Sequence, residues 1–580
     1  MNKVQQFINF APQSAPLRRS IWIIFCSAAA VLLIFLGRSA LIGGEGDFCE
    51  AVRELLAGEE VFAAESWWML ENNGNLWFSM PGSWAAMLLG CSEFACRLPS
   101  VICALLLLAG MMVLAEKFFD RDTMCTAAWM LIGSYGFVYW GRYASGFMFL
   151  AAWAVWTAVW LGCVRRSFWW NTVFFTVVLC GCCWWGMNYM LLLPGIVILN
   201  GAECRRAVFR MSSLAAVISA VLITQGILTV LVLCSGCGLK ESPVQIWEML
   251  SANFIESLDV FIDPAVWWEN WQWYRGMMNL GRLLLPWILP SAAAVVLLVR
   301  KWNELSSEHR RLLTGTLLMI LLSGVLPGRR WQYQLAQLPF VIMLTAGCIS
   351  GYFGDDRLIT VVNTVMKWVL SFVCSLLVAV IVTWPLWQMV LQQSPPVWLM
   401  ILVPLLGVIG LGFLIFDTGS VSSVEKVSGM NGIWSGYVLA GVCCVTAVFA
   451  VSTAELSRFR TGRDFWRACR EQALDLPADE VIFYGREPDP KALFYMDLKQ
   501  GCTVVPDKPA LEEHLKNNVT GRALLIVERG SLDAANTALS AVKWQLNAET
   551  PLAAEYGFGM EPQVLNEWRE KYVLYQIRRK

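Results

Sequence analysis

Charged side chains recur in the short segments between the long apolar runs of this sequence. Glu45 and Asp47 follow the first apolar run, Arg142 lies in "WGRYASGF", and Arg329 and Arg330 are adjacent in "PGRRWQYQL". A guanidinium suits phosphate because it donates two parallel hydrogen bonds. A carboxylate nearby can accept a proton from a hydroxyl group. These residue types therefore indicate a site for an anionic group beside a carboxylate.

Each of these residues also has a structural interpretation. Glu45 and Asp47 are acceptable as solvated loop acids, and an arginine at the membrane edge often extends its charge toward water while its stem lies in lipid. Arg97, in "EFACRLPS", fits that description. Arg329 and Arg330 could bind lipid headgroups, but we expect their loop on the outer side of the membrane, where positively charged residues are usually scarce. That conflict favours a functional interpretation of the pair.

The composition indicates which elements must position these residues. The chain has 580 residues, 57% hydrophobic and 15% charged, and its formal net charge is +0. A soluble domain carries about 45–50% apolar and about 25% charged residues. The balanced charge excludes a nucleic-acid-binding protein with a basic face, and the hydrophobicity excludes a disordered chain. The composition therefore indicates a polytopic membrane protein and argues against an ordinary soluble enzyme.

Long apolar runs divide most of the chain. A membrane-spanning helix needs about 20 mostly apolar residues, and about thirteen runs qualify by that measure. They are centred on residues 20–42, 97–116, 123–140, 144–163, 167–184, 185–201, 210–235, 281–299, 310–327, 331–351, 362–384, 395–416 and 431–453. The predicted fold class is a polytopic α-helical membrane protein with about thirteen transmembrane helices and a small C-terminal extracytoplasmic α/β domain.

The basic residues of the short loops predict the orientation, because Lys and Arg concentrate on the cytoplasmic side. Alternate loops are basic, as at Arg165 and Arg166, whereas the intervening segments 43–96 and 236–280 are acidic or neutral. The N-terminus is therefore predicted to be cytoplasmic, and an odd number of spans places the C-terminus outside. We expect a multi-pass protein of the cytoplasmic (inner) membrane.

The composition changes sharply after residue 453. Residues 1–453 form the predicted transmembrane domain, with outer loops 43–96 and 236–280, and residues 454–580 form the predicted extracytoplasmic domain. Alternating strand and helix patterns in the second domain are typical of an α/β fold. The expected strands cover 480–485, 502–506, 522–530 and 571–579, and the expected helices cover 490–498, 510–518 and 531–543. The first outer loop should hold a helix with Phe48 and Val52 on its apolar face.

Residues 44–100 resemble the first outer loop of the C-type (GT-C) membrane glycosyltransferases. The closest group is the lipid A aminoarabinose transferase and dolichyl-phosphate-mannose protein mannosyltransferase family. In that family the loop reads D-E-x-R-Y-A-E-x-x-R-E-M, then K-P-P, then N-E-F-A-A-R-L-P-S. The residues that match it are Glu45, Glu50, Arg53, Glu54, Pro81, Glu93, Phe94, Ala95, Arg97, Leu98, Pro99 and Ser100.

Three later segments resemble the same family in the same order. "GRYASGFMFL" is similar to its G-R-L-A-T-x-D-M, "LPWILP" to a P-W element after its long outer loop, and "PGRRWQYQLAQLP" to its S-K-R-P-x-Y-x-L-P. The matching residues are Gly141, Arg142, Ala144, Met148, Pro286, Trp287, Arg329, Arg330, Tyr333 and Leu335. Each motif alone is weak, but together, in the right order and on the same predicted membrane face, they are fairly specific.

The resemblance implies a polyprenyl-phosphate-sugar-dependent glycosyltransferase, a hexosyl or pentosyl transferase. It would transfer the sugar with inversion to a lipid, glycan or protein acceptor at the outer face, and the partners would be the lipid-linked donor, that acceptor and membrane lipids. Glu45 and Asp47 would be the catalytic acids, and Arg142, Arg329 and Arg330 would bind the carrier phosphate. The predicted substrate-lining residues are Arg53, Glu93, Arg97, Tyr143, Trp331 and Tyr333.

The sequence departs from the family pattern at the acids. The family's catalytic Asp falls on Gly44, next to Glu45, and its following Arg falls on Asp47. The lysine of K-P-P falls near Ser79, and the Asp of the second loop falls on Phe147. Three explanations are open: Glu45 or Asp47 has taken over the acid's role, the acceptor is already an anion and needs no strong base, or the chain has lost activity.

Two other classes of protein and one cofactor stay open. A secondary transporter would also be polytopic, although transporters usually show paired halves and interrupted spans. A catalytically inactive envelope protein with the GT-C fold would bind the lipid without turnover. Some members of the family bind a divalent cation near the first-loop acids. In this chain only outer-loop carboxylates are placed to bind such a hard ion, and the cofactor is left undefined.

Overall fold

A computed structural model describes the chain over most of its helices and strands. The described residues are 15–41, 45–57, 76–163, 168–185, 187–208, 218–219, 221–223, 273–325, 331–354, 357–391, 397–419, 432–452, 463–473, 476–477, 480–485, 488, 490–497, 502–518, 520–528, 531–546, 552–553 and 572–579. Most of the expected span at 210–235 and most of the expected outer loop 236–280 lie outside these ranges.

Two compact units make up the chain. The first, the helical unit, comprises Met1–Leu36, Arg97–Val380 and Ile401–Val451. The second, the loop–sheet unit, comprises Gly37–Cys96, Ile381–Met400 and Ser452–Lys580. The second unit thus joins the predicted first outer loop to the C-terminal region, which are more than 350 residues apart in the chain.

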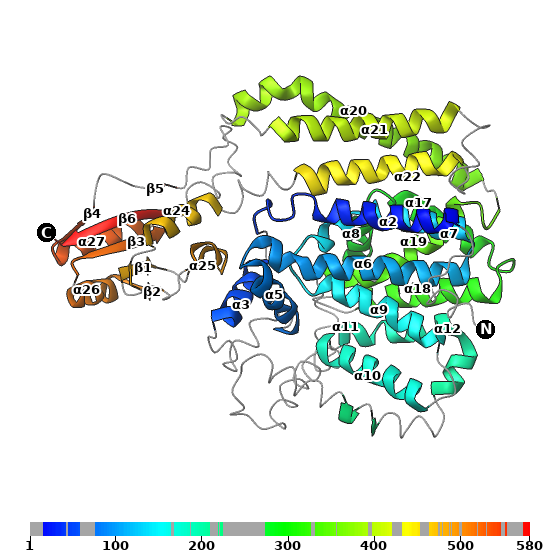
Figure 1. Ribbon diagram of the computed structural model, residues 1–580, viewed down its shortest axis with the longest axis horizontal. Coiled ribbons are helices and arrows are strands. Elements are labelled where there is room, and N and C mark those ends of the chain that lie inside the picture. The colour runs from blue at the N-terminus through cyan, green and yellow to red at the C-terminus, as the bar shows by residue number, and fades with distance from the viewer. Residues whose placement is uncertain are drawn as a thin grey trace. The chain divides into compact units, whose positions relative to one another are not determined.

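The helical unit is built from apolar helices, and Figure 1 shows α2, α6, α9 and α22 with their axes roughly parallel or antiparallel to one another. Some of its helices continue into the second unit. A helix that is apolar all round is buried in protein or lipid, and α19 is an example because each of its residues is buried. The elements are α2 (Ala15–Leu33), α6 (Glu93–Phe118), α7 (Arg121–Ile132), α8 (Tyr135–Gly141), α9 (Phe147–Cys163), α10 (Phe168–Trp185), α11 (Met187–Met190), α12 (Leu193–Val208), α16 (Trp273–Leu284), α17 (Ile288–Arg300), α18 (Ser307–Val325), η2 (Trp331–Gln337), α19 (Leu338–Ile349), α20 (Arg357–Leu391), α21 (Val397–Gly419), α22 (Gly432–Val445) and the π-helical turn η3 (Thr446–Ser452).

The expected spans 123–140 and 281–299 are each broken into shorter helices. The run 123–140 is divided into α7 and α8, where Ser134 caps α8 by accepting a hydrogen bond from the Phe137 N–H (3.4 Å). The run 281–299 is divided into α16 and α17, which are bent by 117° at a break that contains Pro286. A proline has no N–H to continue a helix, so a break there is expected.

Within the described part of the chain, two helical segments are long and apolar enough to cross a membrane by themselves, Glu93–Phe118 and Arg357–Ala379. The bent pair of α16 and α17 adds a third if it is one span. Six further apolar helical segments of 10–17 residues lie in the described part of the chain. The expected number of about thirteen spans stays a prediction.

The C-terminal region forms a six-stranded mixed sheet with the order β2-β1-β3-β6-β4, and β5 pairs with β6. β1 pairs parallel with β2 and β3, and β6 pairs antiparallel with β3, with Leu525 opposite Tyr575. The expected strands and helices are present, and α24, β4 and β5 are additional. The elements are α24 (Arg463–Ala473), β1 (Val481–Tyr484), α25 (Pro490–Met496), β2 (Thr503–Val505), α26 (Lys508–Asn517), β3 (Arg522–Glu528), α27 (Leu532–Ala541), β4 (Trp544–Leu546), β5 (Leu552–Ala553) and β6 (Tyr572–Arg579).

Side chains from both faces of this sheet are buried, as successive residues of a strand point to opposite sides. On one face, Ile482 and Leu525 share a core with Leu511 of α26 and Leu539 of α27. On the other face, the ring of Phe483 lies 6.3 Å from that of Trp466 in α24. Helices therefore cover the two faces, and α24 belongs to the face opposite α26 and α27.

The expected helix of the first outer loop is present as α3 (Glu45–Ala57), and its apolar face packs on α5 (Leu76–Leu89). Phe48 and Val52 are buried, as the sequence pattern predicts. A Cβ atom at Gly82 in α5 would lie 2.8 Å from Val52 Cγ2, so the absence of a side chain lets the two helices approach closely.

Candidate active site

The predicted catalytic acids lie in the first turn of α3. Glu45 is 1% exposed, Asp47 is half-buried, and Gly46 lies between them. The N-terminal end of a helix stabilises negative charge through its unpaired N–H groups and its dipole. We call residues 45–47 the acid turn. The position of these two carboxylates on a short helix restricts the directions in which they can move.

A helix of the C-terminal region packs directly against the acid turn. A Cβ atom at Gly46 would lie 2.5 Å from Lys491 Cγ and 3.0 Å from the Lys491 backbone nitrogen, at the start of α25. Such distances are shorter than normal van der Waals contacts, so any side chain at Gly46 would push the two helices apart. The glycine between the acids is therefore needed for this contact.

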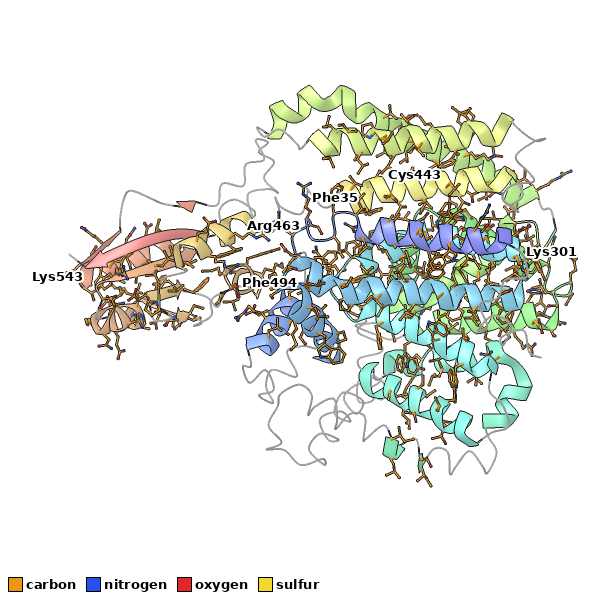
Figure 2. The ribbon with its side chains drawn as sticks, viewed as in Figure 1. Phe35, Lys301, Cys443, Arg463, Phe494 and Lys543 are labelled. Carbon is orange, nitrogen blue, oxygen red and sulfur yellow. The ribbon has the colours of Figure 1, made fainter. Side chains whose placement is uncertain are left out.

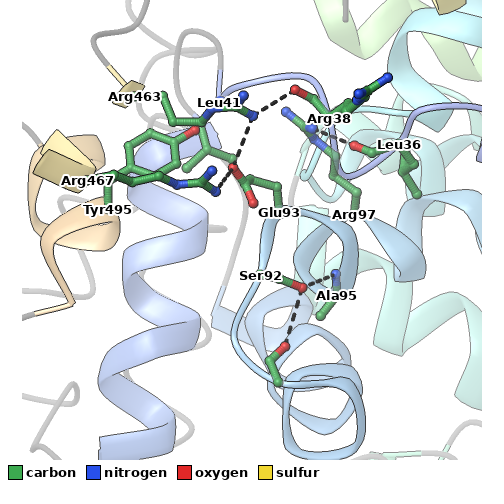
Figure 3. Close-up of polar contacts among 11 residues, drawn as sticks. Leu36, Arg38, Leu41, Ser92, Glu93, Ala95, Arg97, Arg463, Arg467 and Tyr495 are labelled. Carbon is green, nitrogen blue, oxygen red and sulfur yellow. Dashed lines mark hydrogen bonds and ion pairs between the residues drawn. The ribbon is translucent and has the colours of Figure 1, made fainter. Parts of the chain in front are cut away.

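Glu93, at the start of α6, is the centre of an ion-pair cluster with α24 (Figure 3). Its Oε1 atom accepts a hydrogen bond from Arg467 Nη2 at 2.9 Å and lies 3.6 Å from Arg463 Nη1. The side chains of Glu93 and Arg463 are 5% and 7% exposed, whereas that of Arg467 is 49% exposed. We call Glu93, Arg463 and Arg467 the Glu93 cluster. Both partners of this predicted substrate-lining residue thus come from the C-terminal region.

Helices α24 and α25 also bind the backbone that precedes the acid turn. Arg463 Nη1 donates a hydrogen bond to the Arg38 carbonyl oxygen at 2.7 Å, and the Leu41 N–H donates to the Tyr495 hydroxyl at 2.8 Å (Figure 3). The guanidinium of Arg467 lies over the Tyr495 ring, 5.7 Å from its centroid. In Figure 2 the label Arg463 marks α24 and the label Phe494 marks α25.

Arg53, expected to line the substrate site, pairs with Glu50 one turn earlier on α3. Its Nε and Nη2 atoms donate to the two carboxylate oxygens of Glu50 at 2.9 and 2.7 Å. Burial and, to a smaller extent, the charge of Glu50 raise the pKa of the Cys502 thiol to about 11, whereas the charge of Arg53 opposes this increase. The fork-shaped pair fixes both side chains on α3.

Arg142, expected at the carrier phosphate, bonds to backbone carbonyls in the helical unit. Its Nη1 atom donates to the carbonyl oxygens of Val31, Leu32 and Ile34 at 3.0, 3.0 and 2.6 Å, and its Nη2 atom donates to that of Ala450 at 3.1 Å. The last carbonyls of a helix have no partner within the helix. Arg142 therefore caps the C-terminal end of α2 and connects it to η3.

Other motif residues of the helical unit also donate hydrogen bonds to backbone carbonyl oxygens. Arg97 is 1% exposed and its Nη1 atom donates to the Leu36 carbonyl oxygen at 2.8 Å. The Ser100 hydroxyl donates to the Ser145 carbonyl oxygen at 3.1 Å, which links the first-loop motif to the second-loop motif. A Cβ atom at Gly141 would lie 2.7 Å from Leu32 Cδ2, so this motif glycine permits close packing.

Aromatic rings surround the position where the family has its second-loop Asp. Phe147 is buried and its ring packs against Trp140, with centroids 5.2 Å apart. Tyr143 is buried against the same tryptophan at 4.8 Å and stacks on Tyr139 at 5.6 Å. Phe147 therefore has a packing role in this chain.

Several predicted residues lie beyond what the structure describes. Arg329, Arg330 and Gly44 fall outside the described ranges. Trp331 and Tyr333 belong to η2, and their side chains are not described. Their assignments stay predictions.

Sequence reasoning missed the residues of the C-terminal region that contact the predicted first outer loop, namely Arg463, Arg467, Lys491 and Tyr495. One signal was present, because the arginines of "RDFWRACREQA" follow each other at helical spacing. Arg463, Arg467 and Arg470 at intervals of four and three residues share one face of a helix. Their partners were not predictable from this pattern, because they lie hundreds of residues away.

The donor set for a metal is limited. Among the residues that the structure describes, no group of three or more His, Cys, Asp or Glu side chains is arranged to hold a metal ion. We therefore derive no step of the chemistry through a cation.

Comparison with solved structures shows the fold. The chain aligns with a crystal structure of ArnT, an aminoarabinose transferase, from Cupriavidus metallidurans bound to undecaprenyl phosphate, with a TM-score of 0.60 and 13% identity over 96% of this chain and 97% of that one. The apo structure of the same ArnT gives a TM-score of 0.59 at the same identity and coverage. This chain therefore has the fold of the GT-C membrane glycosyltransferases. The similarity to ArnT extends along nearly the whole length of both chains.

A weaker likeness is to the archaeal oligosaccharyltransferase AglB from Archaeoglobus fulgidus, in complex with an inhibitory peptide and a dolichol-phosphate. It has a TM-score of 0.40 and 10% identity over 88% of this chain and 70% of that one, a score too low to show a shared fold. No family model matches the sequence, and no curated protein matches it.

Proposed function

We propose that this protein transfers a sugar from a polyprenyl-phosphate-linked donor to a lipid, glycan or protein acceptor at the outer face of the membrane. The observation that carries the proposal is the fold shared with ArnT along 96% of the chain, since that ArnT structure holds undecaprenyl phosphate. The acid turn and the arginine-bearing motifs supply the kinds of group that such a reaction uses. Because a fold alone does not define function, the proposal also depends on the chemistry of these residues.

The chemistry is an inverting displacement. The acceptor oxygen forms a bond to the anomeric carbon, and the bond from that carbon to the carrier phosphate oxygen breaks. The electron pair leaves with the phosphate, and a carboxylate takes the acceptor's proton. Arginines stabilise the phosphate charge that develops, which lowers the barrier. The products are the glycosylated acceptor and the polyprenyl phosphate.

Each group of residues has a proposed role. Glu45 or Asp47 accepts the proton, and Arg329 with Arg330 binds the carrier phosphate. The guanidinium of Arg142 is bonded to four backbone carbonyls. We therefore give Arg142 the role of holding the end of α2 and leave the direct phosphate contact to the other two arginines.

The remaining predicted residues divide into lining and supporting groups. Tyr143, Trp331 and Tyr333 line the sugar pocket in this proposal. Arg53 and Arg97 support the site through the bonds that each makes within its own unit. The proposal keeps the cytoplasmic N-terminus, the inner-membrane location and the extracytoplasmic region 454–580.

Transfer from a mixture of radiolabelled polyprenyl-phosphate sugars, measured in membranes, tests the proposal. Wild type is compared with Glu45→Gln, Asp47→Asn and Arg329→Ala, and Glu513→Gln on the exposed side of α26 is the matched control. We expect transfer by wild type and the control, and its loss in Arg329→Ala and in one acid variant. Lipid binding without any transfer would identify a catalytically inactive protein, and the absence of both would favour a transporter.

A further inference from the structure

Three contacts from α24 and α25 converge on the short stretch of backbone that includes the acid turn. Arg463 binds the Arg38 carbonyl at 2.7 Å, and the Tyr495 hydroxyl accepts from the Leu41 N–H at 2.8 Å. Lys491 fills the space against Gly46, where a Cβ atom would lie 2.5 Å from its Cγ. The contacts fall on both sides of residues 42–44, so they hold the backbone before and within the acid turn.

The residues that make these contacts are themselves held in place. Glu93 lies 3.6 Å from Arg463 Nη1, and both side chains are buried. Arg467 bonds to the same carboxylate at 2.9 Å and covers the Tyr495 ring. A buried charge keeps its partner because separation would leave it unpaired in a medium of low dielectric constant. The Glu93 cluster thus connects the arginine contact to the tyrosine contact.

We propose that Arg463, Tyr495 and Lys491 are positioning residues for the acids of the acid turn. The C-terminal helices would hold Glu45 and Asp47 in the geometry that proton transfer requires, without touching the substrate. This inference rests on the proposed function, because it assigns those acids a catalytic role. A displacement of about 1 Å in a reacting group lowers the rate by about 100-fold, so loss of these contacts should lower kcat.

The first test uses Tyr495→Phe, which removes one oxygen atom and retains the ring. Its matched control is Tyr484→Phe, which removes the same atom from a buried tyrosine in the core of the sheet. We expect Tyr495→Phe to lower kcat at least tenfold while KM for the lipid-linked donor changes less than threefold. The control should retain both values. Equal kcat in the two variants would overturn the proposal.

A second pair of variants tests the glycine contact. Gly46→Ala places a Cβ atom against Lys491 Cγ, so kcat should fall at least tenfold. Lys491→Ala removes that Cγ atom, so the double variant Gly46→Ala with Lys491→Ala should recover at least part of the lost kcat. A structural defect unrelated to this contact would not be rescued. Failure of the rescue would overturn the role of Lys491.

Hydrogen exchange of the peptide that covers residues 38–48 separates this proposal from the proposed function. Tyr495→Phe removes the acceptor of the Leu41 N–H, so that amide should exchange at least tenfold faster than in wild type or Tyr484→Phe. Unchanged exchange would refute the positioning contact whatever the activity. Faster exchange in a protein whose wild type transfers no sugar would support the contact and refute the proposed function.

Discussion

Replacing Glu93 by glutamine should weaken the Glu93 cluster, and the buried Arg463 should account for most of the loss. Arg467 is the nearer arginine, at 2.9 Å against 3.6 Å, but its side chain is 49% exposed. With an effective dielectric constant of 20 for the buried pair, the Coulomb energy at 3.6 Å is roughly 4.6 kcal/mol. With the dielectric constant of water for the exposed pair, the energy at 2.9 Å is roughly 1.4 kcal/mol.

Desolvation and side-chain entropy reduce both energies. Breaking a buried pair costs about 3–5 kcal/mol, and an exposed pair contributes about 0.2–1 kcal/mol. Arg463 keeps its hydrogen bond to the Arg38 carbonyl in the variant, so we take the lower limit of about 3 kcal/mol. Since about 1.4 kcal/mol corresponds to a factor of ten, amides of α24 should exchange roughly 100-fold faster.

A double-mutant cycle measures the two couplings separately. Glu93→Gln is combined with Arg463→Gln in one cycle and with Arg467→Gln in the other, and hydrogen exchange of residues 463–473 reports the opening free energy. The first coupling energy should exceed the second by about 2 kcal/mol, and only the second should fall strongly in 1 M salt, because exposed charges are screened. A larger coupling to Arg467 would refute the reasoning that burial outweighs distance.

Three other predictions follow from single contacts. Arg142→Leu should lower the melting temperature of the substrate-free protein, because four carbonyl contacts are lost; an unchanged melting temperature with lost activity would indicate a purely catalytic role. Gly441→Ala should destabilise the helical unit by about 1–3 kcal/mol, because its Cβ atom would overlap Trp287 Cη2; urea unfolding in detergent that matches wild type would contradict this. Burial raises the pKa of the Cys469 thiol from 9.0 to about 12. Because the folded state favours the neutral thiol, the thiol's contribution to the free energy of unfolding is complete below pH 9 and falls as the pH rises toward 12. Cys469→Ser should reduce the loss of stability between pH 9 and 12. The same loss in the variant as in wild type would refute the assignment.

Local sequence patterns predicted the secondary structure of the C-terminal region well. The strands expected at 480–485 and 522–530 are β1 and β3, and the helix expected at 510–518 is α26. Their apolar residues recur at the spacing of a strand or a helix. In the structure α26 is also capped by Asp507, which accepts a hydrogen bond from the Ala510 N–H. The short strands β4 and β5 were missed because two or three residues are too few to show a period.

Apolar composition predicted a mostly helical protein but was less informative about where each helix ends. The run 123–140 contains Gly133 and Ser134, and the structure ends α7 and begins α8 there. Serine can cap a helix or lie within one, and only the surrounding packing selects between these options. The position of each break therefore followed from tertiary contacts.

The sequence by itself determined the class of fold and the order of the motifs, because both depend on residue types along the chain. It placed Glu45 and Asp47 close together along the chain but did not indicate which distant residues pack near them. The tertiary structure decided that α25 packs against Gly46 and that Glu93 pairs with α24. These contacts join residues separated by more than 350 positions. Such pairings depend on shape and charge complementarity between folded elements, for which a single sequence carries no local signal.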